Sequence, residues 1–160
     1  MKPTLYLETT IPSYLAARTS RDLVVAAHQQ ITQEWWEKRL ADFRVYISQL
    51  VLEECALGDT GAAKRRMALL KGLPVLDIDE KVLKLAQAMV TSGAIPGKVG
   101  ADAIHVAAAA VNGLDFLLTW NCTHIHNAET VQDLTAVCLV HDYRCPVICT
   151  PEELMGEINL

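Results

Sequence analysis

The sequence predicts an α/β protein, a three-layer α/β/α sandwich around a central, mainly parallel five-stranded sheet. Short apolar segments alternate along the chain with longer segments of helical periodicity, which is the order from which parallel sheets are built. The short segments are apolar throughout rather than at alternate residues, as in strands covered on both faces. The segment 101–111 is small and apolar nearly all round, and a helix of this kind is buried on most sides.

We expect a single domain spanning residues 1–160, because this length suffices for one substantial core. No apolar run approaches the roughly 18 residues that a membrane-spanning helix needs. A glutamate, Glu8, interrupts the apolar N-terminal segment where a signal peptide would have to continue. We therefore expect a cytoplasmic protein without a membrane partner. The 5 cysteines show no C-x-x-C spacing, so we expect them to be reduced and mostly buried.

The predicted strands are short apolar runs that end at turn residues, prolines or glycines. The first ends in Glu-Thr-Thr, and Pro12 then begins the next turn or helix. The fourth follows Asn112 and Gly113, which tolerate the left-handed conformation of a helix C-terminus. The five strands are expected at 4–7, 45–48, 75–78, 116–119 and 146–149.

The predicted helices are recognised by their apolar stripes and terminal residues. In the helix expected over 21–40, a stripe at four-residue spacing predicts the buried face. Asp79 is a typical N-cap for the helix that runs to Gly93, and Pro151 with two glutamates favours the start of a terminal helix. The other helices are expected at 50–57, 62–70, 101–111 and 129–141. The stripe in 21–40 consists of Leu23, Ala27, Ile31 and Trp35, and that of the helix after Asp79 of Val82, Leu83, Ala86, Met89 and Val90.

Polar side chains with oxygen atoms follow three of the predicted strands. One further carboxylate lies near the start of the helix that precedes the fourth strand. Parallel strands place their carboxyl ends at one edge of the sheet, where sites form near the point at which strand order reverses. Carboxylates that meet there repel one another unless a cation neutralises them. Mg²⁺ or Mn²⁺ prefers such oxygen ligands, and either ion activates water for attack on a phosphodiester. The side chains in question are Glu8, Thr9, Glu53, Glu54, Asp102, Thr119 and Asn121.

Four segments of the chain resemble, in order, the four motifs of PIN domains. They are Leu5-Tyr-Leu-Glu-Thr-Thr10, Ile47-Ser-Gln-Leu-Val-Leu-Glu-Glu54 with Gly58 shortly after, Asp102-Ala-Ile-His-Val-Ala107 and Leu117-Leu-Thr-Trp-Asn121. The resemblance implies a PIN-like α/β/α fold and a metal-dependent ribonuclease of the kind seen in VapC-type toxins. It also implies RNA as substrate, a homodimer, and an antitoxin protein as partner in a type II toxin–antitoxin pair.

The resemblance assigns the catalytic and metal-binding roles to Glu8, Glu54, Asp102 and Asn121, with Mg²⁺ or Mn²⁺ as cofactor. Glu8 stands where the family usually has its first aspartate, and its extra methylene would move the ion or change its coordination. Asn121 falls at the fourth position, where it supplies an oxygen but no charge. With three carboxylates instead of four, a second metal ion would be held less tightly.

Each of these residues also has a purely structural interpretation. Asp102 could be satisfied by the N–H groups of a helix start, and Asn121 could cap the turn that follows it. Glu8 could be exposed at a strand end, and Glu53 competes with Glu54 for the second position. Two other functions stay open: a non-catalytic module that binds RNA or a protein partner, and a doubly wound enzyme acting on a small phosphorylated substrate. The latter lacks its expected phosphate-binding loop.

Other polar clusters are expected to be structural. Cys122-Thr-His-Ile-His126 lacks a second pair at zinc-site spacing. His105 lies three residues after Asp102, and we expect a core histidine bonded to that carboxylate. The pair Trp35–Trp36 is expected in core or dimer packing. The net charge of −5 argues mildly against non-specific polyanion binding, and Lys64–Arg66, the candidate phosphate contact, is more often a solvated helix face.

Overall fold

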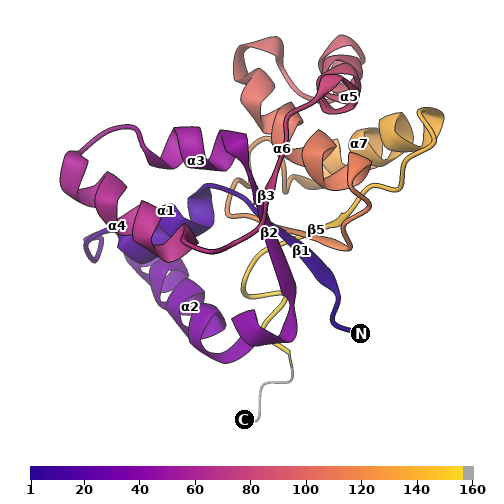
Figure 1. The fold of residues 1–160 in the computed structure, drawn as a ribbon. Coiled ribbons are helices and arrows are strands. Elements are labelled where there is room, and N and C mark those ends of the chain that lie inside the picture. The colour runs from indigo at the N-terminus through magenta and orange to yellow at the C-terminus, as the bar shows by residue number, and fades with distance from the viewer. Residues whose placement is uncertain (157–160) are drawn as a thin grey trace.

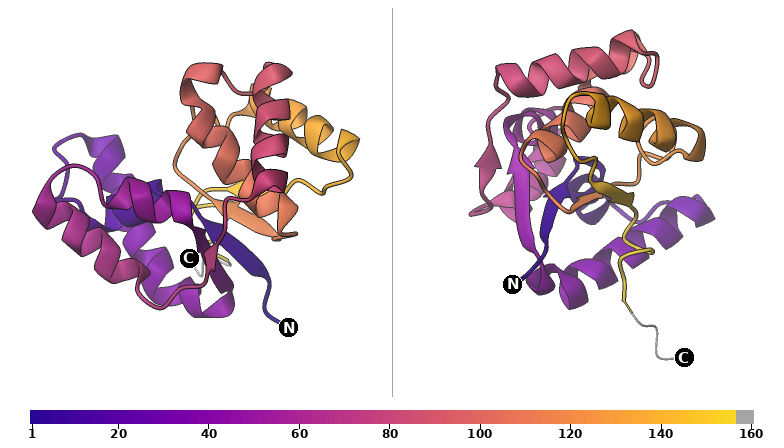
Figure 2. Two further views of the ribbon diagram at one scale, coloured as in Figure 1. Left: turned by 45° about the horizontal axis from the view of Figure 1, so that its top comes forward. Right: turned by 90° about the vertical axis from the view of Figure 1, so that its right-hand side faces the viewer.

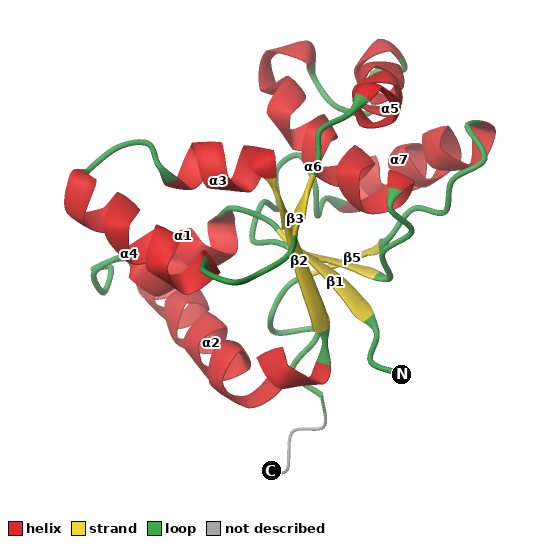
Figure 3. Ribbon diagram, viewed as in Figure 1, coloured by secondary structure: helices red, strands yellow, loops and turns green. Residues whose placement is uncertain are grey.

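A single parallel sheet forms the centre of the computed structural model, which describes residues 1–156 (Figure 1 and Figure 3). Its five strands have the order β3-β2-β1-β4-β5, and every neighbouring pair is parallel. The predicted five-stranded sheet is therefore confirmed. The strands are β1 (Thr4–Leu7), β2 (Arg44–Ser48), β3 (Val75–Leu76), β4 (Phe116–Leu118) and β5 (Val147–Cys149).

Helices cover both faces of this sheet, which confirms the three-layer α/β/α prediction. Helices α1 to α4 gather on one side and α5 to α7 on the other (Figure 1 and Figure 2). Short 3₁₀ turns at Leu40–Asp42 and Gly97–Val99 precede β2 and α6. The helices are α1 (Thr10–Ala16), α2 (Leu23–Arg39), α3 (Gln49–Cys55), α4 (Thr60–Leu70), α5 (Glu80–Thr91), α6 (Gly100–Val111) and α7 (Ala128–Val140). None of the helices within residues 1–156 has the length and apolarity needed to cross a membrane.

The strand order brings the ends of β1 and β4 together. The chain adds β2 and β3 on one side of β1, and β4 and β5 on the other. Strand order thus reverses between β1 and β4, which is the place where open α/β sheets bind their ligands. Leu7 pairs with Leu118, so Glu8 and Thr119 leave the sheet side by side. The Glu8 amide donates to the Leu118 carbonyl at 3.1 Å.

The core is densest where β1 and β4 lie between the two helix layers. Leu5, Tyr6, Leu7, Leu117 and Leu118 are fully buried, and α6 carries a nearly continuous row of buried alanines. Helix α6 packs mainly against α5 and also contacts α3 and β4, so it is covered on several sides, which explains why it is apolar all round.

Replacing Leu117 by alanine in the central strand β4 is expected to lower the free energy of unfolding by about 2–5 kcal/mol, because a fully buried leucine leaves a cavity. Val147→Ala in the edge strand β5 is the matched control, since Val147 is 59% exposed. Urea denaturation monitored by circular dichroism measures both values. Equal, small effects would show that β4 is not packed as described.

The buried face of α2 differs from the predicted stripe. Trp35 is fully buried, but Leu23 is 85% exposed and Ala27 also faces solvent. Polar contacts set this face instead: the Gln29 amide binds the backbone of Arg18 and Ser20, and the buried Thr32 hydroxyl accepts a bond from the Trp120 indole. A pattern of apolar residues alone therefore identified the wrong face in the first turns.

Three further expectations need correction in detail. β3 is only two residues long, and Leu83 of α5 is 48% exposed although Asp79 caps that helix as predicted. In place of the terminal helix, residues 151–154 form turns. Thr150 and Glu153 bond reciprocally, as at the start of a helix, but Gly156 adopts a φ of 87°, which is not helical. Residues 157–160 lie outside the described part of the chain.

Candidate active site

Glu8 lies directly after β1 and is only 4% exposed. Its Oε1 accepts the hydroxyls of Thr10, at 2.5 Å, and Thr119, at 2.6 Å, while Oε2 accepts the Thr10 amide at 3.2 Å. Burial of a carboxylate is costly unless hydrogen bonds replace its water. The start of α1 and the end of β4 supply these bonds, so Glu8 joins the two central strands and cannot be an exposed strand-end residue.

Glu54 lies near the end of α3 and faces the same edge of the sheet. Its Oε1 accepts the Thr9 hydroxyl at 2.6 Å and lies 2.6 Å from His105 Nε2. Partial burial opposes its ionisation, but the hydrogen bonds and charge of His105 and the Thr9 hydroxyl outweigh burial and hold the pKa of Glu54 below its ordinary value. Glu54 is therefore ionised at neutral pH. Its competitor Glu53 is exposed to solvent.

A chain of buried polar groups stands behind Glu54. The Tyr6 hydroxyl lies 2.7 Å from His105 Nδ1 and 2.8 Å from Ser48 Oγ. Burial raises the pKa of Tyr6, so its hydroxyl keeps its proton. The Tyr6 hydroxyl therefore lies between Ser48 Oγ and His105 Nδ1 and can donate to the imidazole, whose Nε2 bonds to Glu54. His105 is thus a core histidine as expected, but the carboxylate that it binds is Glu54.

Asp102 is half-buried in the first turn of α6. Burial raises its pKa and the charge of Glu54 raises it further, whereas a hydrogen bond from the Asn121 side chain and the charges of His105 and His124 act in the opposite direction. Asn121 Oδ1 accepts the His124 amide at 3.0 Å, which leaves the Asn121 NH₂ group as the donor to Asp102. Asn121 therefore caps its turn and also contacts the site.

The side chains of Thr9 and Thr119 hold the carboxylates of the site in place. Each donates its hydroxyl to a carboxylate, Thr9 to Glu54 and Thr119 to Glu8. Thr10 completes the arrangement, since its hydroxyl donates to Glu8 and accepts the Trp120 amide at 2.8 Å. Sequence reasoning overlooked Thr10. Its place in Glu-Thr-Thr directly after a strand was the available signal.

The donor chemistry at this edge suits a hard cation, because Glu54 and Asp102 offer carboxylates and Asn121 an amide oxygen. Burial is the main cause of the raised pKa of Asp102, and the charge of Glu54 adds a small further increase. As the side chains stand, however, no three His, Cys, Asp or Glu residues within 1–156 form a group that could hold a metal ion. The oxygens of Glu8 and Glu54 are engaged by hydroxyls and by His105, and Asn121 Oδ1 is engaged by the His124 amide, so coordination requires some of these bonds to be exchanged.

The zinc alternative gains no support. His126 Nε2 lies 2.6 Å from a Glu153 oxygen, and Cys122 is exposed. Within residues 1–156, no three His, Cys, Asp or Glu side chains are grouped so as to hold a metal ion, and this includes the segment from Cys122 to His126. His126 instead connects the turn after β4 to the turn after β5.

The remaining basic and aromatic motifs are structural. Arg65 donates to the Ala16 carbonyl at the end of α1, and Arg66 donates to the carbonyls of Cys55 and Leu57 at the end of α3. Cations at helix C-termini satisfy carbonyls that have no partner within the helix. Trp35 is fully buried and donates to the Leu154 carbonyl, which agrees with core packing.

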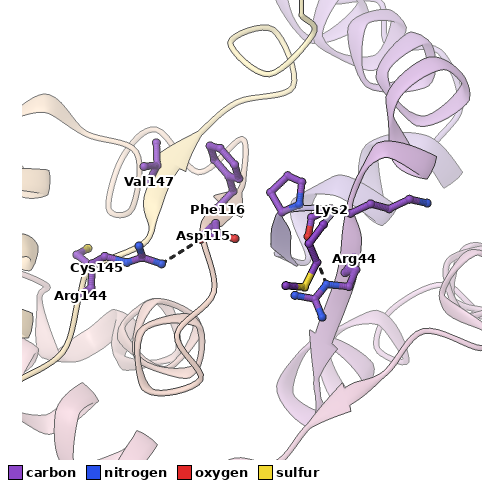
Figure 4. A pocket seen from close by; sticks show the side chains of 9 residues that line it. Lys2, Arg44, Asp115, Phe116, Arg144, Cys145 and Val147 are labelled. Atoms are coloured by element: carbon purple, nitrogen blue, oxygen red, sulfur yellow. Dashed lines mark hydrogen bonds and ion pairs between the residues drawn. The ribbon is translucent and has the colours of Figure 1, made fainter.

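A hollow of about 540 Å³ lies at the opposite edge of the sheet and contains none of the predicted site residues (Figure 4). Asp115 stands on one wall, where it accepts bonds from the Thr4 amide and hydroxyl and pairs with Arg144 at 3.0 Å. Arg44 stands on the other, with its Nε bonded to the Lys2 carbonyl. These contacts join the beginnings of β1, β2 and β4, so this hollow serves the fold rather than the carboxylate site.

Comparison with known proteins agrees with this geometry. A chain of VapBC2 from Rickettsia felis, solved bound to a DNA fragment from their promoter, is similar with a TM-score of 0.58 at 15% identity over 92% of this chain and 98% of that chain. At this identity the likeness shows the fold alone. No curated protein matches the sequence. The family model of the PIN domain, whose members are typically metal-dependent nucleases, matches residues 6–121, a span that contains Glu8, Glu54, Asp102 and Asn121. The chain therefore belongs to the PIN domain family.

Proposed function

We propose that this PIN domain is a Mg²⁺- or Mn²⁺-dependent endoribonuclease that hydrolyses RNA phosphodiester bonds at the edge formed by β1 and β4. One observation carries the proposal. Three carboxylates from separate segments lie around this edge: Glu8 follows β1, Glu54 bonds to the adjacent Thr9, and the pKa of Asp102 is raised by burial and, to a smaller extent, by the charge of Glu54. A fold that places acidic groups within reach of one another's charge stabilises a divalent cation and, through it, a phosphodiester substrate.

Glu54, Asp102 and Asn121 would hold the ion, and Glu8 would complete the site. A bound ion supplies an activated water and neutralises the charge that develops on the phosphate. The threonines orient the carboxylates, and the Asn121 amide holds Asp102. No side chain acts as a covalent nucleophile. Because Asn121 carries no charge, the site favours one tightly held ion over two.

We further propose that the enzyme is the toxin of a type II toxin–antitoxin pair and acts in the cytoplasm as a homodimer under the control of an antitoxin. The fold shared with a VapBC2 chain supports this assignment. Leu139 and Val140 at the end of α7 are 74% and 78% exposed, and a partner chain that docked on this end of the helix would cover them.

The second candidate is a catalytically degenerate PIN module that binds RNA or a protein partner. The absence, within residues 1–156, of three side chains placed to hold a metal ion favours it. So do the bonds that engage Glu8 and Glu54. The two candidates differ in one measurable property, which is RNA hydrolysis in the presence of a divalent ion.

The test compares two neighbouring glutamates. Glu54→Gln is expected to lower the rate of RNA cleavage in Mn²⁺ by about 100-fold, because it removes a charge from the site. Glu53→Gln, at an exposed position of the same helix, is expected to cleave like the wild type. Digestion of a mixed RNA, followed by gel electrophoresis, measures both. Wild-type protein without any cleavage would favour the binding module, and equal loss in both variants would remove Glu54 from the site.

A further inference from the structure

Three aromatic side chains lie nearly parallel beside the candidate active site: Tyr14 of α1, His28 of α2 and Trp120 after β4. The His28 and Trp120 rings are stacked with centroids 3.9 Å apart and an interplanar angle of 10°. Tyr14 lies 6.1 Å from Trp120 at 13° and 6.5 Å from His28 at 19°. If Tyr14 were stacked on top of this pair, its centroid would be about twice as far from the more distant ring as from the nearer one. Tyr14 therefore lies beside the pair rather than on it.

This arrangement differs from the aromatic contacts of the core. Trp35 and Phe43 are tilted by 33°, Phe43 and Phe116 meet at 88°, and Tyr6 and His105 at 66°. Two of these core contacts are edge-to-face and the third is tilted, so none of the three is stacked. The parallel rings of Tyr14 and His28 are instead only partly buried, so both keep area that solvent or a ligand can reach.

Hydrogen bonds hold the base of the aromatic cluster in place. The Trp120 indole N–H donates to Thr32 Oγ1 at 2.7 Å, and that hydroxyl donates to the His28 carbonyl at 2.6 Å. The Trp120 backbone amide donates to Thr10 Oγ1 at 2.8 Å. Trp120 is 8% exposed. A buried, anchored indole thus supports two rings that remain accessible.

The cluster adjoins the carboxylates. Trp120 stands between Thr119, which binds Glu8, and Asn121, which binds Asp102. Burial raises the pKa of Tyr14, and the nearby charge of Glu8 raises it further, so the Tyr14 ring lies within electrostatic reach of the site. A nucleotide whose phosphate occupies the carboxylate edge would extend its base toward these rings.

We propose that Tyr14, supported by His28 and Trp120, forms a nucleobase-binding subsite that stacks one base of single-stranded RNA next to the scissile phosphate. The inference rests on the proposed ribonuclease function and assigns its substrate contact. Every base has a flat π-face, and stacking on an aromatic side chain contributes about 1–3 kcal/mol per base without strong sequence preference. Arg65 and Arg66 of α4 donate to the carbonyls at helix ends. We therefore expect aromatic stacking to contribute more to the affinity for RNA beside this acidic site than these basic side chains do.

The test measures binding of a fluorescein-labelled eight-nucleotide RNA by anisotropy, with the wild-type protein in Mn²⁺ as parent and phosphorothioate linkages in the probe so that it resists hydrolysis. Tyr14→Leu is expected to weaken binding about tenfold, and Tyr14→Phe, which keeps the ring, is expected to bind like the parent. Tyr143→Leu is the matched control, because that half-buried tyrosine precedes β5 at the opposite edge of the sheet. Equal binding by Tyr14→Leu and its parent, or loss of binding in Tyr14→Phe, would overturn the subsite.

A second measurement needs no change at Tyr14. In a series of probes, each of which lacks the base at one position, the probe that lacks the stacked base is expected to bind the parent about tenfold more weakly than the intact RNA does. This difference between the two probes is expected to vanish in Tyr14→Leu. A penalty that persists in the variant would overturn the proposal. Cleavage by protein with an intact Asp102 separates this from the proposed function: inactive protein contradicts the ribonuclease, whereas active protein with an unchanged KM in Tyr14→Leu contradicts only the subsite.

Discussion

Asp102→Asn is expected to lower the rate of RNA cleavage about 100-fold or more while leaving the protein at least as stable as the wild type. The substitution preserves the shape of the side chain and removes a charge from the centre of the proposed site. Loss of one preorganised electrostatic group in an active site typically costs this much in rate.

The stability part follows from the raised pKa of Asp102. A carboxyl whose pKa is higher in the folded than in the unfolded protein binds its proton more tightly when folded. The ionised form therefore destabilises the protein above the folded pKa, and this cost disappears as the pH falls through that value. An amide at position 102 never carries the charge, so Asp102→Asn removes the cost at neutral pH.

Initial rates on a labelled RNA and a thermal melt followed by circular dichroism test both parts. Asp133→Asn, at an exposed position of α7, is the matched control for loss of one negative charge. Cleavage by Asp102→Asn at the wild-type rate would contradict the site. A large drop in melting temperature would show that Asp102 serves the fold instead.

His105→Leu is expected to lower the free energy of unfolding by about 2–4 kcal/mol, because it removes the partner of a buried hydroxyl and of a carboxylate together. His105 is 1% exposed and lies between Tyr6, at 2.7 Å, and Glu54, at 2.6 Å. Leucine fills much of the space of the imidazole but leaves the Tyr6 hydroxyl without its acceptor. Urea denaturation measures the change, with His141→Leu at the end of α7 as control.

The same variant is expected to change the pH dependence of cleavage. The pKa of Glu54 lies below its ordinary value partly because of His105. Without that partner burial dominates, so the pKa of Glu54 rises and the acid limb of the rate profile moves to higher pH. A carboxylate whose pKa is lower in the folded than in the unfolded protein stabilises the fold at any pH above the unfolded-state pKa. This stabilisation is lost as the pH falls through the folded-state pKa. His105→Leu is expected to reduce this acid-dependent loss, and an unchanged acid limb would exclude His105 from positioning Glu54.

The sheet and its active edge could be predicted because they depend on local patterns. Apolar runs located β1, β2, β4 and β5 closely, and the polar residues directly after β1 and β4 identified the edge. The partner of His105 could not be predicted in this way. Its spacing from Asp102 on α6 suggested one carboxylate, but Glu54 on α3 is brought to the imidazole by packing of distant segments.

The aromatic cluster shows the same limit. Tyr14, His28 and Trp120 come from three segments, and none stands out in the pattern of its own helix or strand end. The face of α2 that carries His28 is chosen by Gln29 and Thr32, whose polar contacts are invisible to a search for apolar stripes. Hydrogen bonds between side chains of distant elements therefore determine the partner of His105 and the buried face of α2, which local sequence patterns could not predict.

Calorimetric titration of Mn²⁺ into the metal-free protein, wild type beside Asp102→Asn, tests the central claim most directly when the same samples are also assayed for RNA digestion. Wild-type protein is expected to bind the ion and to cleave RNA, and the substitution is expected to abolish both. Binding that persists in the variant, or wild-type protein that neither binds the ion nor cleaves RNA, would contradict the assignment of this sheet edge as a nuclease centre.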